Sequence, residues 1–279
     1  MGKYSPPPNF RKASLGNVSG MDFRQRYGPW ALITGASAGL GACYAHALGA
    51  RGLGLVLVAR RQQRMEALAE KIRGEHAVQV CCIGLDLTAE GAVEQLCEEL
   101  AGKELGLLVN NAGFGHVGPF LDQEPAALRQ MVRLNCEVPA MLAHSLLPAM
   151  RSRGHGGMLV LASAAGYQPT PWMSAYGASK GFDLLWSEGV AVELAKDGVD
   201  VLAVSPGHTD TEFHRVAGVE GAVIGGSARP EDVVEQSLRF LGKRISFVHG
   251  RLNYWSTWSA RLFPRRLVAK MVGRLLKNR

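Results

Sequence analysis

Short apolar runs alternate along the chain with longer segments in which apolar residues recur at helical spacing. The runs are rich in β-branched residues and nearly continuous, which is typical of strands that are buried on both faces. The predicted strands cover residues 30–34, 55–59, 78–84, 105–109, 158–163, 199–205 and 245–249. The predicted helices cover residues 42–51, 62–74, 89–101, 125–151, 175–196 and 230–241.

Regular alternation of strands and helices with short connections predicts right-handed βαβ units. The expected fold class is therefore α/β, a Rossmann fold with a doubly wound sheet of seven parallel strands and helices on both faces. We expect an N-terminal extension over residues 1–27, one folded domain over residues 28–250 and a basic amphipathic tail over residues 251–279.

Composition narrows the range of partners. The chain has 279 residues, of which 47% are hydrophobic and 20% charged, as in ordinary globular proteins. Its net charge of +7 is uneven, because seven Arg or Lys fall between Arg261 and Arg279 without any Asp or Glu. These basic residues are not interleaved with an aromatic platform, so we expect no nucleic-acid partner.

The five cysteines form no CxxC pair, and no histidine has the spacing of a zinc ligand. We expect reduced, mostly buried thiols and no metal site. Residues 1–17 are polar and contain three consecutive prolines, without the apolar core of a signal peptide. We therefore expect a cytoplasmic location.

A glycine-rich turn follows the first predicted strand. Residues 34–41 read Thr-Gly-Ala-Ser-Ala-Gly-Leu-Gly and open the first helix. Glycines at such a turn let backbone N–H groups approach a pyrophosphate, and the helix N-terminus favours its negative charge. A plain turn is the alternative, but the position between strand and helix favours nucleotide binding. The candidate residues are Gly35, Ser37, Ala38, Gly39, Leu40 and Gly41.

Arg60 and Arg61 come at the end of the second strand, where NAD-binding folds place an acidic residue for the ribose 2′-hydroxyl. No acid is adjacent here, and an arginine suits the 2′-phosphate of NADP instead. The alternative is a solvated, basic start to the next helix. The sequence favours NADP(H) over NAD(H).

Tyr176 and Lys180 are four residues apart at the start of a predicted helix, so their side chains share one face. A free tyrosine has a pKa of about 10, and a nearby cation lowers it toward the range useful for proton transfer. Alone, this spacing is more often an ordinary helix face. Ser163 is predicted to end a strand at the same sheet edge, where its hydroxyl can hold a carbonyl oxygen.

These motifs together resemble the short-chain dehydrogenase/reductase family. The resemblance rests on their order and spacing over residues 28–250. It is carried by residues 34–41 (TGxxxGxG), Asp86-Leu87, residues 110–113 (NNAG), Asn135, Ser163, residues 176–180 (YxxxK) and Pro206-Gly207.

The resemblance implies a role for each residue. Tyr176 would exchange a proton with the substrate oxygen, and Ser163 would orient the carbonyl. Lys180 would lower the pKa of Tyr176 and bind the nicotinamide ribose. Asn135 would hold a water in a proton relay. The remaining implied cofactor contacts are Asp86 and Leu87 at the adenine, Asn111, Ala112 and Gly113 near the adenosine ribose, and Pro206, Gly207, Thr209 and Thr211 over the nicotinamide.

Within the family, residues 27–31, the arginine after the second strand and the C-terminal tail resemble microsomal-type 3-oxoacyl-CoA reductases and 17β-hydroxysteroid dehydrogenases. The resemblance implies a small apolar carbonyl substrate and a homodimer or homotetramer through the helices at 125–151 and 175–196. The chain departs from those relatives in showing no N-terminal membrane anchor.

Two further segments suggest contacts. Residues 208–227 form a long, glycine-containing connection that we interpret as a lid over the substrate. In the tail, apolar residues at helical spacing are flanked by Arg and Lys. We favour packing of this helix on its own domain or on another subunit, with peripheral membrane contact as the alternative.

The leading hypothesis is an NADP(H)-dependent oxidoreductase that reduces a carbonyl group to a secondary alcohol. One alternative is an NAD-dependent alcohol or hydroxysteroid dehydrogenase that works in the oxidative direction. The other is a non-catalytic, nucleotide-sensing protein on the same fold. The intact set of Asn135, Ser163, Tyr176 and Lys180 argues against a sensor, which needs no proton donor.

Overall fold

A single sheet of seven parallel strands organises the computed structural model, which describes residues 22–210 and 227–277. The strand order is β3-β2-β1-β4-β5-β6-β7. The strands are β1 Trp30–Thr34, β2 Gly54–Ala59, β3 Val80–Gly84, β4 Leu105–Asn110, β5 Gly156–Leu161, β6 Val199–Ser205 and β7 Ser246–Val248. The predicted α/β class, the doubly wound order and the seven strands are confirmed.

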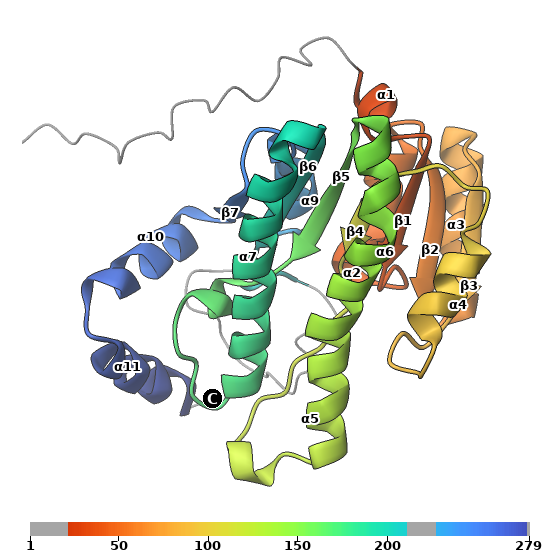
Figure 1. Cartoon of the computed structure of the whole chain (residues 1–279). Coiled ribbons are helices and arrows are strands. Elements are labelled where there is room, and N and C mark those ends of the chain that lie inside the picture. The colour runs from red at the N-terminus through yellow and green to blue at the C-terminus, as the bar shows by residue number, and fades with distance from the viewer. Residues whose placement is uncertain (1–21, 211–226, 278–279) are drawn as a thin grey trace, which may run out of the picture.

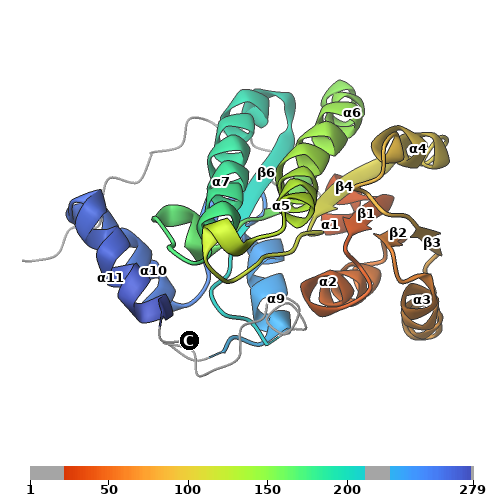
Figure 2. The same cartoon turned by 90° about the horizontal axis from the view of Figure 1, so that it is seen from below.

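Helices cover both faces of the sheet, as Figures 1 and 2 show. Helices α2 Gly39–Gly49, α3 Gln62–His76 and α9 Pro230–Phe240 lie on one face. The opposite face carries α4 Ala92–Glu99, α5 Pro125–Val132, α6 Val138–Arg153 and α7 Ser174–Leu194. Two more helices, α10 Arg251–Ser259 and α11 Arg265–Lys277, lie at the outer edge beside α7.

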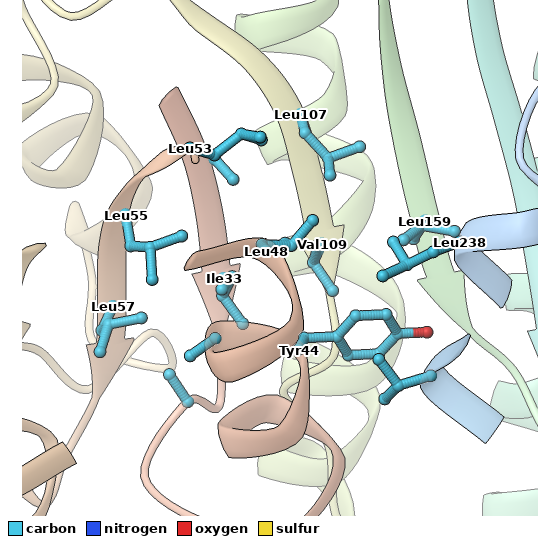
Figure 3. Close-up of a cluster of buried hydrophobic side chains, with 14 of the residues drawn as sticks. Ile33, Tyr44, Leu48, Leu53, Leu55, Leu57, Leu107, Val109, Leu159 and Leu238 are labelled. Carbon is cyan, nitrogen blue, oxygen red and sulfur yellow. The ribbon is translucent and has the colours of Figure 1, made fainter. Parts of the chain in front are cut away.

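Successive residues of each strand enter two separate hydrophobic cores. Ile33, Leu55 and Leu107 pack with Tyr44 and Leu48 of α2 in the first core (Figure 3). Their neighbours in the strands, among them Leu32, Val56 and Leu108, pack with α4 and α6 in the second core. This explains the nearly continuous apolar runs, because neither face of a central strand meets water.

A short helix, α1 Phe23–Tyr27, precedes the first strand and packs on the domain. The buried Tyr27 hydroxyl donates a hydrogen bond of 2.7 Å to Asp200 in β6, and Arg26 Nε donates one of 2.6 Å to the same carboxylate. Residues 23–27 fall within the segment that we assigned to the N-terminal extension. In the structure they are anchored to the sheet by this ion pair.

The predicted helix over residues 125–151 is not continuous. A π-helical turn, Arg133–Glu137, separates α5 from α6. Pro139 lacks an N–H, and its ring crowds the carbonyl four residues earlier, which belongs to Asn135. The wider π turn relieves this crowding, so the turn and Asn135 coincide.

The end of β5 and the connection after β6 differ in how far they test the sequence predictions. Strand β5 ends at Leu161, so the prediction that Ser163 ends the strand was wrong by two residues; Ser163 instead caps a short 3₁₀ helix, Ala164–Tyr167. The predicted lid lies largely in residues 211–226, outside the described residues. No helix in the described ranges has the length and apolar character needed to cross a bilayer.

Candidate active site

A cavity of about 640 Å³ opens at the carboxyl ends of β1, β2, β4, β5 and β6. Open parallel sheets bind ligands at this edge. Most of the residues predicted for the site line it: Gly35, Ser37, Ala38, Gly39, Leu40, Arg60, Arg61, Asp86, Leu87, Asn111, Ala112, Gly113, Ser163, Tyr176, Lys180, Pro206, Gly207 and Thr209. Gly41 and Asn135 do not line it, and Thr211 falls outside the described residues.

The glycine-rich turn is held against the end of β4 by hydrogen bonds. Asn111 Nδ2 donates to the carbonyl oxygens of Thr34 at 2.8 Å and Gly35 at 3.2 Å. The Thr34 hydroxyl accepts from the backbone N–H groups of Asn111 and Ala112, both at 3.0 Å. The two strand ends therefore form one rigid floor under the cavity.

Glycine is required twice in this turn for different reasons. Gly35 has φ = 67°, a conformation that side chains disfavour. At Gly41, a Cβ atom would overlap the Gly35 carbonyl oxygen and the Asn111 amide. Helix α2 begins at Gly39, and Ala38 before it provides no side-chain cap. The first N–H groups of α2 thus remain for an anion such as a pyrophosphate.

Two arginines lie at the end of the cavity beyond this turn. Arg61 Nε and Nη2 donate to the Ser37 hydroxyl at 3.1 and 3.0 Å. Arg60 is exposed and attracts the Asp86 carboxylate, which also accepts hydrogen bonds from Thr88. Although burial opposes it, these contacts hold the pKa of Asp86 below its usual value. The basic pair and the turn fit the phosphate groups of a dinucleotide.

Helix α7 presents Tyr176 and Lys180 to the cavity, as the four-residue spacing predicts. Both side chains are buried. The Ser163 side chain hydrogen-bonds Tyr176 and also accepts from the Ala165 N–H at 3.1 Å. Lys180 Nζ donates to the Leu161 carbonyl oxygen at the end of β5, at 2.6 Å. Ser163, Tyr176 and Lys180 thus converge although they come from two elements.

The net pKa of Tyr176 is raised. Burial disfavours the phenolate, and this outweighs the lowering by the Lys180 ammonium and the Ser163 hydrogen bond. Lys180 thus lowers the pKa of Tyr176, as the sequence suggested, but burial decides the direction of the net shift. In this environment Tyr176 is a protonated phenol.

One charged residue of the site was missed at the sequence level. Asp183 Oδ2 lies 2.9 Å from Lys180 Nζ, and both side chains are almost fully buried. Burial lowers the pKa of Lys180, but the charge and hydrogen bond of Asp183, together with the neighbouring Tyr176, outweigh burial, and the net pKa is raised. Burial also raises the pKa of the Asp183 carboxyl, which Lys180 opposes. Residues three apart on a helix are neighbours, so the Lys-x-x-Asp spacing was the available signal.

Asn135 supports the site from behind. Its Nδ2 donates to Phe114 O at 2.9 Å and to Ser179 Oγ at 3.0 Å, and its Oδ1 accepts from Phe114 N at 3.1 Å. A Cβ atom on Gly113 would lie 3.0 Å from Asn135 Oδ1 and 3.5 Å from Lys180 Nζ. Asn135 and Lys180 therefore approach the same point on the β4 loop. The water relay implied for Asn135 stays a prediction.

A group of potential metal ligands lies elsewhere. Atoms of His46, Glu75 and His76 are within 4.8 Å of one another on α2 and α3. None of the three lines the cavity. Lys71 Nζ is 3.9 Å from Glu75 Oε1, a position that opposes a bound cation.

Comparison with known proteins gives a consistent result. Residues 29–219 match the family model described as short chain dehydrogenase. A 7beta-hydroxysteroid dehydrogenase of Clostridium sardiniense is 30% identical over 234 residues, which cover 84% of this chain and 90% of that protein. A very-long-chain 3-oxoacyl-CoA reductase of Podospora anserina is 34% identical over 248 residues, 86% of this chain and 72% of that protein.

Solved structures resemble the chain throughout the fold. A structure from a study of 7beta-hydroxysteroid dehydrogenase stereoselectivity superposes with a TM-score of 0.84 and 27% sequence identity. The match covers 91% of this chain and 100% of the other chain. A short-chain dehydrogenase from Sphingobium yanoikuyae in complex with NADPH has a TM-score of 0.75 and 33% identity, with coverage of 84% and 94%.

The close approach at Gly41 yields a test of the nucleotide-binding turn. We predict that Gly41→Ala weakens dinucleotide binding by about 1–3 kcal/mol, because the added methyl group displaces the Gly35 carbonyl or the Asn111 amide. Isothermal titration calorimetry with NADPH measures this loss. Gly74→Ala in α3 is the control, since its Cβ would meet nothing within 4 Å. Equal affinities for both variants would refute this role for the turn.

Proposed function

The chain belongs to the short-chain dehydrogenase family, and from this premise we propose that it is an NADP(H)-dependent oxidoreductase that reduces the carbonyl group of an apolar substrate. The observation that carries this proposal is the position of the buried Tyr176 side chain, which is hydrogen-bonded to Ser163 and lies one helical turn from Lys180. Asn135, Ser163, Tyr176 and Lys180 are the proposed catalytic and supporting residues.

A carbonyl carbon becomes an alcohol when it gains a hydride and its oxygen gains a proton. The nicotinamide of a dinucleotide bound in the cavity supplies the hydride. The Tyr176 hydroxyl delivers the proton to the substrate oxygen, which Ser163 holds by a second hydrogen bond. Lys180 stabilises the phenolate that remains on Tyr176.

The proposed cofactor is NADP(H). Arg60 and Arg61 line the same end of the cavity, and the guanidinium group of Arg61 is fixed on Ser37 of the glycine-rich turn. Two guanidinium groups suit a doubly charged 2′-phosphate, whereas the 2′-hydroxyl of NAD calls for an acceptor. The NADPH complex of a 33% identical relative supports this assignment.

An apolar substrate is supported by the wall of the cavity beyond Tyr176. This wall carries Phe114, Val117, Met173, and also Val272 and Leu276 from α11. Two relatives are named for hydroxysteroids and for very-long-chain 3-oxoacyl-CoA, compounds whose ring system and acyl chain are apolar. We propose that residues 28–250 form the catalytic domain and that the tail completes its substrate pocket.

Asp183 favours reduction over oxidation. Its buried carboxylate lies against the Lys180 ammonium and raises the pKa of Tyr176, in the same direction as burial. A phenol kept protonated is ready to donate, as reduction requires. Oxidation of an alcohol needs the phenolate as a base. A protonated Lys180 without a carboxylate beside it would stabilise that phenolate more strongly.

A homo-oligomer formed through α7 is also part of the proposal. The outward face of α7 carries Ala178, Phe182, Leu185, Gly189 and Val192, all exposed and uncharged at helical spacing. Burial of such a stripe against a second copy removes it from water. The proposed location is the cytoplasm.

Removal of the Tyr176 hydroxyl tests the proton donor. We predict that Tyr176→Phe lowers kcat for carbonyl reduction by roughly 10²–10⁴-fold, because a phenyl ring cannot donate a proton. NADPH affinity, measured by fluorescence titration, should stay within about twofold of the parent. A variant with unchanged kcat would eliminate the proposed mechanism.

Charge reversal at the adenosine end tests the cofactor. We predict that Arg60→Asp and Arg61→Asp each raise the Kd for NADPH by roughly 10–100-fold, because a charged hydrogen bond is replaced by repulsion. Affinity for NADH should change far less. Arg64→Asp removes the same charge from α3 at a residue that does not line the cavity. If this control weakens NADPH binding as much as the other two, the arginines do not select the cofactor.

The Asp183 argument predicts a change in pH dependence. Reduction requires protonated Tyr176, so activity falls as pH rises through its pKa. Over the pH range in which Lys180 keeps its proton, Asp183→Asn removes a carboxylate that raises the pKa of Tyr176, so the alkaline limb of the reductive kcat/KM profile should move to lower pH. Asp183→Glu, which retains a carboxylate, should return the limb toward higher pH.

Asp197→Asn, at the end of the same helical segment, is the matched control because its carboxylate pairs with Arg151 at the surface. An alkaline limb that stays in place, or moves to higher pH, in Asp183→Asn would show that Asp183 does not bias the phenol.

A further inference from the structure

The end of the chain concentrates exposed apolar side chains. Nine of the seventeen large hydrophobic residues that are exposed in the described part of the chain lie between Leu252 and Leu275. They belong to α10, to α11 and to the connection between these helices: Leu252, Tyr254, Trp255, Trp258, Leu262, Phe263, Leu267, Met271 and Leu275. Folded proteins seldom leave so many together in water without an interaction partner.

Helix α11 has two apolar faces, and only one of them is used by the domain. Val268 is buried, and Val272 and Leu276 line the cavity. The Gly273 carbonyl oxygen accepts a 3.0 Å hydrogen bond from Trp172 Nε1, which fixes the helix on the loop before α7. Packing on its own domain, one of the two packing arrangements that the sequence favoured, therefore accounts for this face alone.

The second face points outward. Leu267, Met271 and Leu275 are four residues apart, so they form one stripe along α11. Each has 44–54% of its surface exposed. At the outer edge of the molecule, α10 adds Trp255 and Trp258, whose rings contact each other edge to face. Tryptophan rings are favoured where apolar and polar surroundings meet.

Basic residues border this stripe. At 100° per residue, Arg266, Lys270, Arg274 and Lys277 form the neighbouring face of α11. All four are exposed. No Asp or Glu occurs between Arg251 and Arg279, so no acidic side chain of the same segment neutralises them. An apolar stripe beside a cationic face is the pattern of a helix that lies in the interface of an anionic bilayer.

We propose that the outward face of α10 and α11 docks the protein on an anionic lipid surface. Leu267, Met271, Leu275, Trp255 and Trp258 enter the interface, and the four basic residues of α11 contact the phosphate headgroups. Charge complementarity favours lipid over a second copy at this face. In a two-fold dimer, the basic face of one copy would lie against the identical basic face of the other.

Helix α11 carries both the proposed lipid-facing surface and part of the cavity wall. The lipid-facing stripe and the cavity-lining residues Val272 and Leu276 lie on different faces of the same helix. A helix with its side chains is about 10 Å across, so the cavity wall lies within about one helix width of the docked surface. Docking itself depends only on α10 and α11 and does not require the proposed activity.

Vesicle flotation with the full chain tests the proposal. One set of vesicles contains equal parts of phosphatidylglycerol and phosphatidylcholine, and the other contains phosphatidylcholine alone. We expect binding to the anionic vesicles that weakens as salt is added, and little binding to the neutral ones. Met271→Gln with Leu275→Gln should weaken it by roughly tenfold or more, as should Lys270→Glu with Arg274→Glu.

Phe120→Gln with Leu121→Gln is the matched control, since it removes exposed apolar side chains that belong to neither α10 nor α11 and should leave binding unchanged. Circular dichroism and NADPH binding establish that each variant is folded. Equal binding to both kinds of vesicle, or equal binding by all variants, would overturn the proposal. Sedimentation velocity without lipid gives the remaining outcome: an oligomer that dissociates in the α11 variants but not in the control would assign this face to a second copy and overturn lipid docking.

Discussion

Parallel pairing of β1, β4, β5 and β6 is the constraint on which the site depends. It brings the carboxyl ends of these strands to one edge, although the segments that follow them are far apart in the chain. Thr34 and Asn111 hold two of those ends together, because the side chain of each residue hydrogen-bonds the backbone of the other. The glycine-rich turn, the arginines after β2 and the segment that carries Ser163 can meet around one cavity only because this edge is fixed.

Helix α7 then adds the chemistry to the edge. Its first turns cover the end of β5, where Lys180 donates to the Leu161 carbonyl oxygen and pairs with Asp183. A buried ion pair costs desolvation, and it persists only with good geometry and further hydrogen bonds. Here it orders Lys180, while burial of the phenol raises the pKa of Tyr176. The tail completes the far wall, so one helix, α11, both shapes the pocket and presents a cationic, apolar surface outward.

Hydrophobic patterning predicted the sheet well, because every central strand is buried on both faces and the connections are short. The same patterning could not show that a π turn interrupts the helix at Asn135, or that β5 ends before Ser163. These features depend on backbone hydrogen bonds rather than on periodicity. Asp183 was missed for a different reason: it belongs to none of the recognised motifs, and a carboxylate on a helix is usually solvated. The ordered motifs located the cavity, whereas the balance of charge within it required the packed structure.

The central claim is that Tyr176, placed by this edge and kept protonated, completes an NADPH-dependent carbonyl reduction. The most direct measurement is NADPH oxidation by the purified protein across a panel of ketones that includes steroid, aromatic, and medium- and long-chain 3-oxoacyl compounds. The account predicts stoichiometric conversion of NADPH and ketone to NADP⁺ and secondary alcohol with at least one bulky apolar member. Binding of NADPH without turnover of any member of the panel would contradict it.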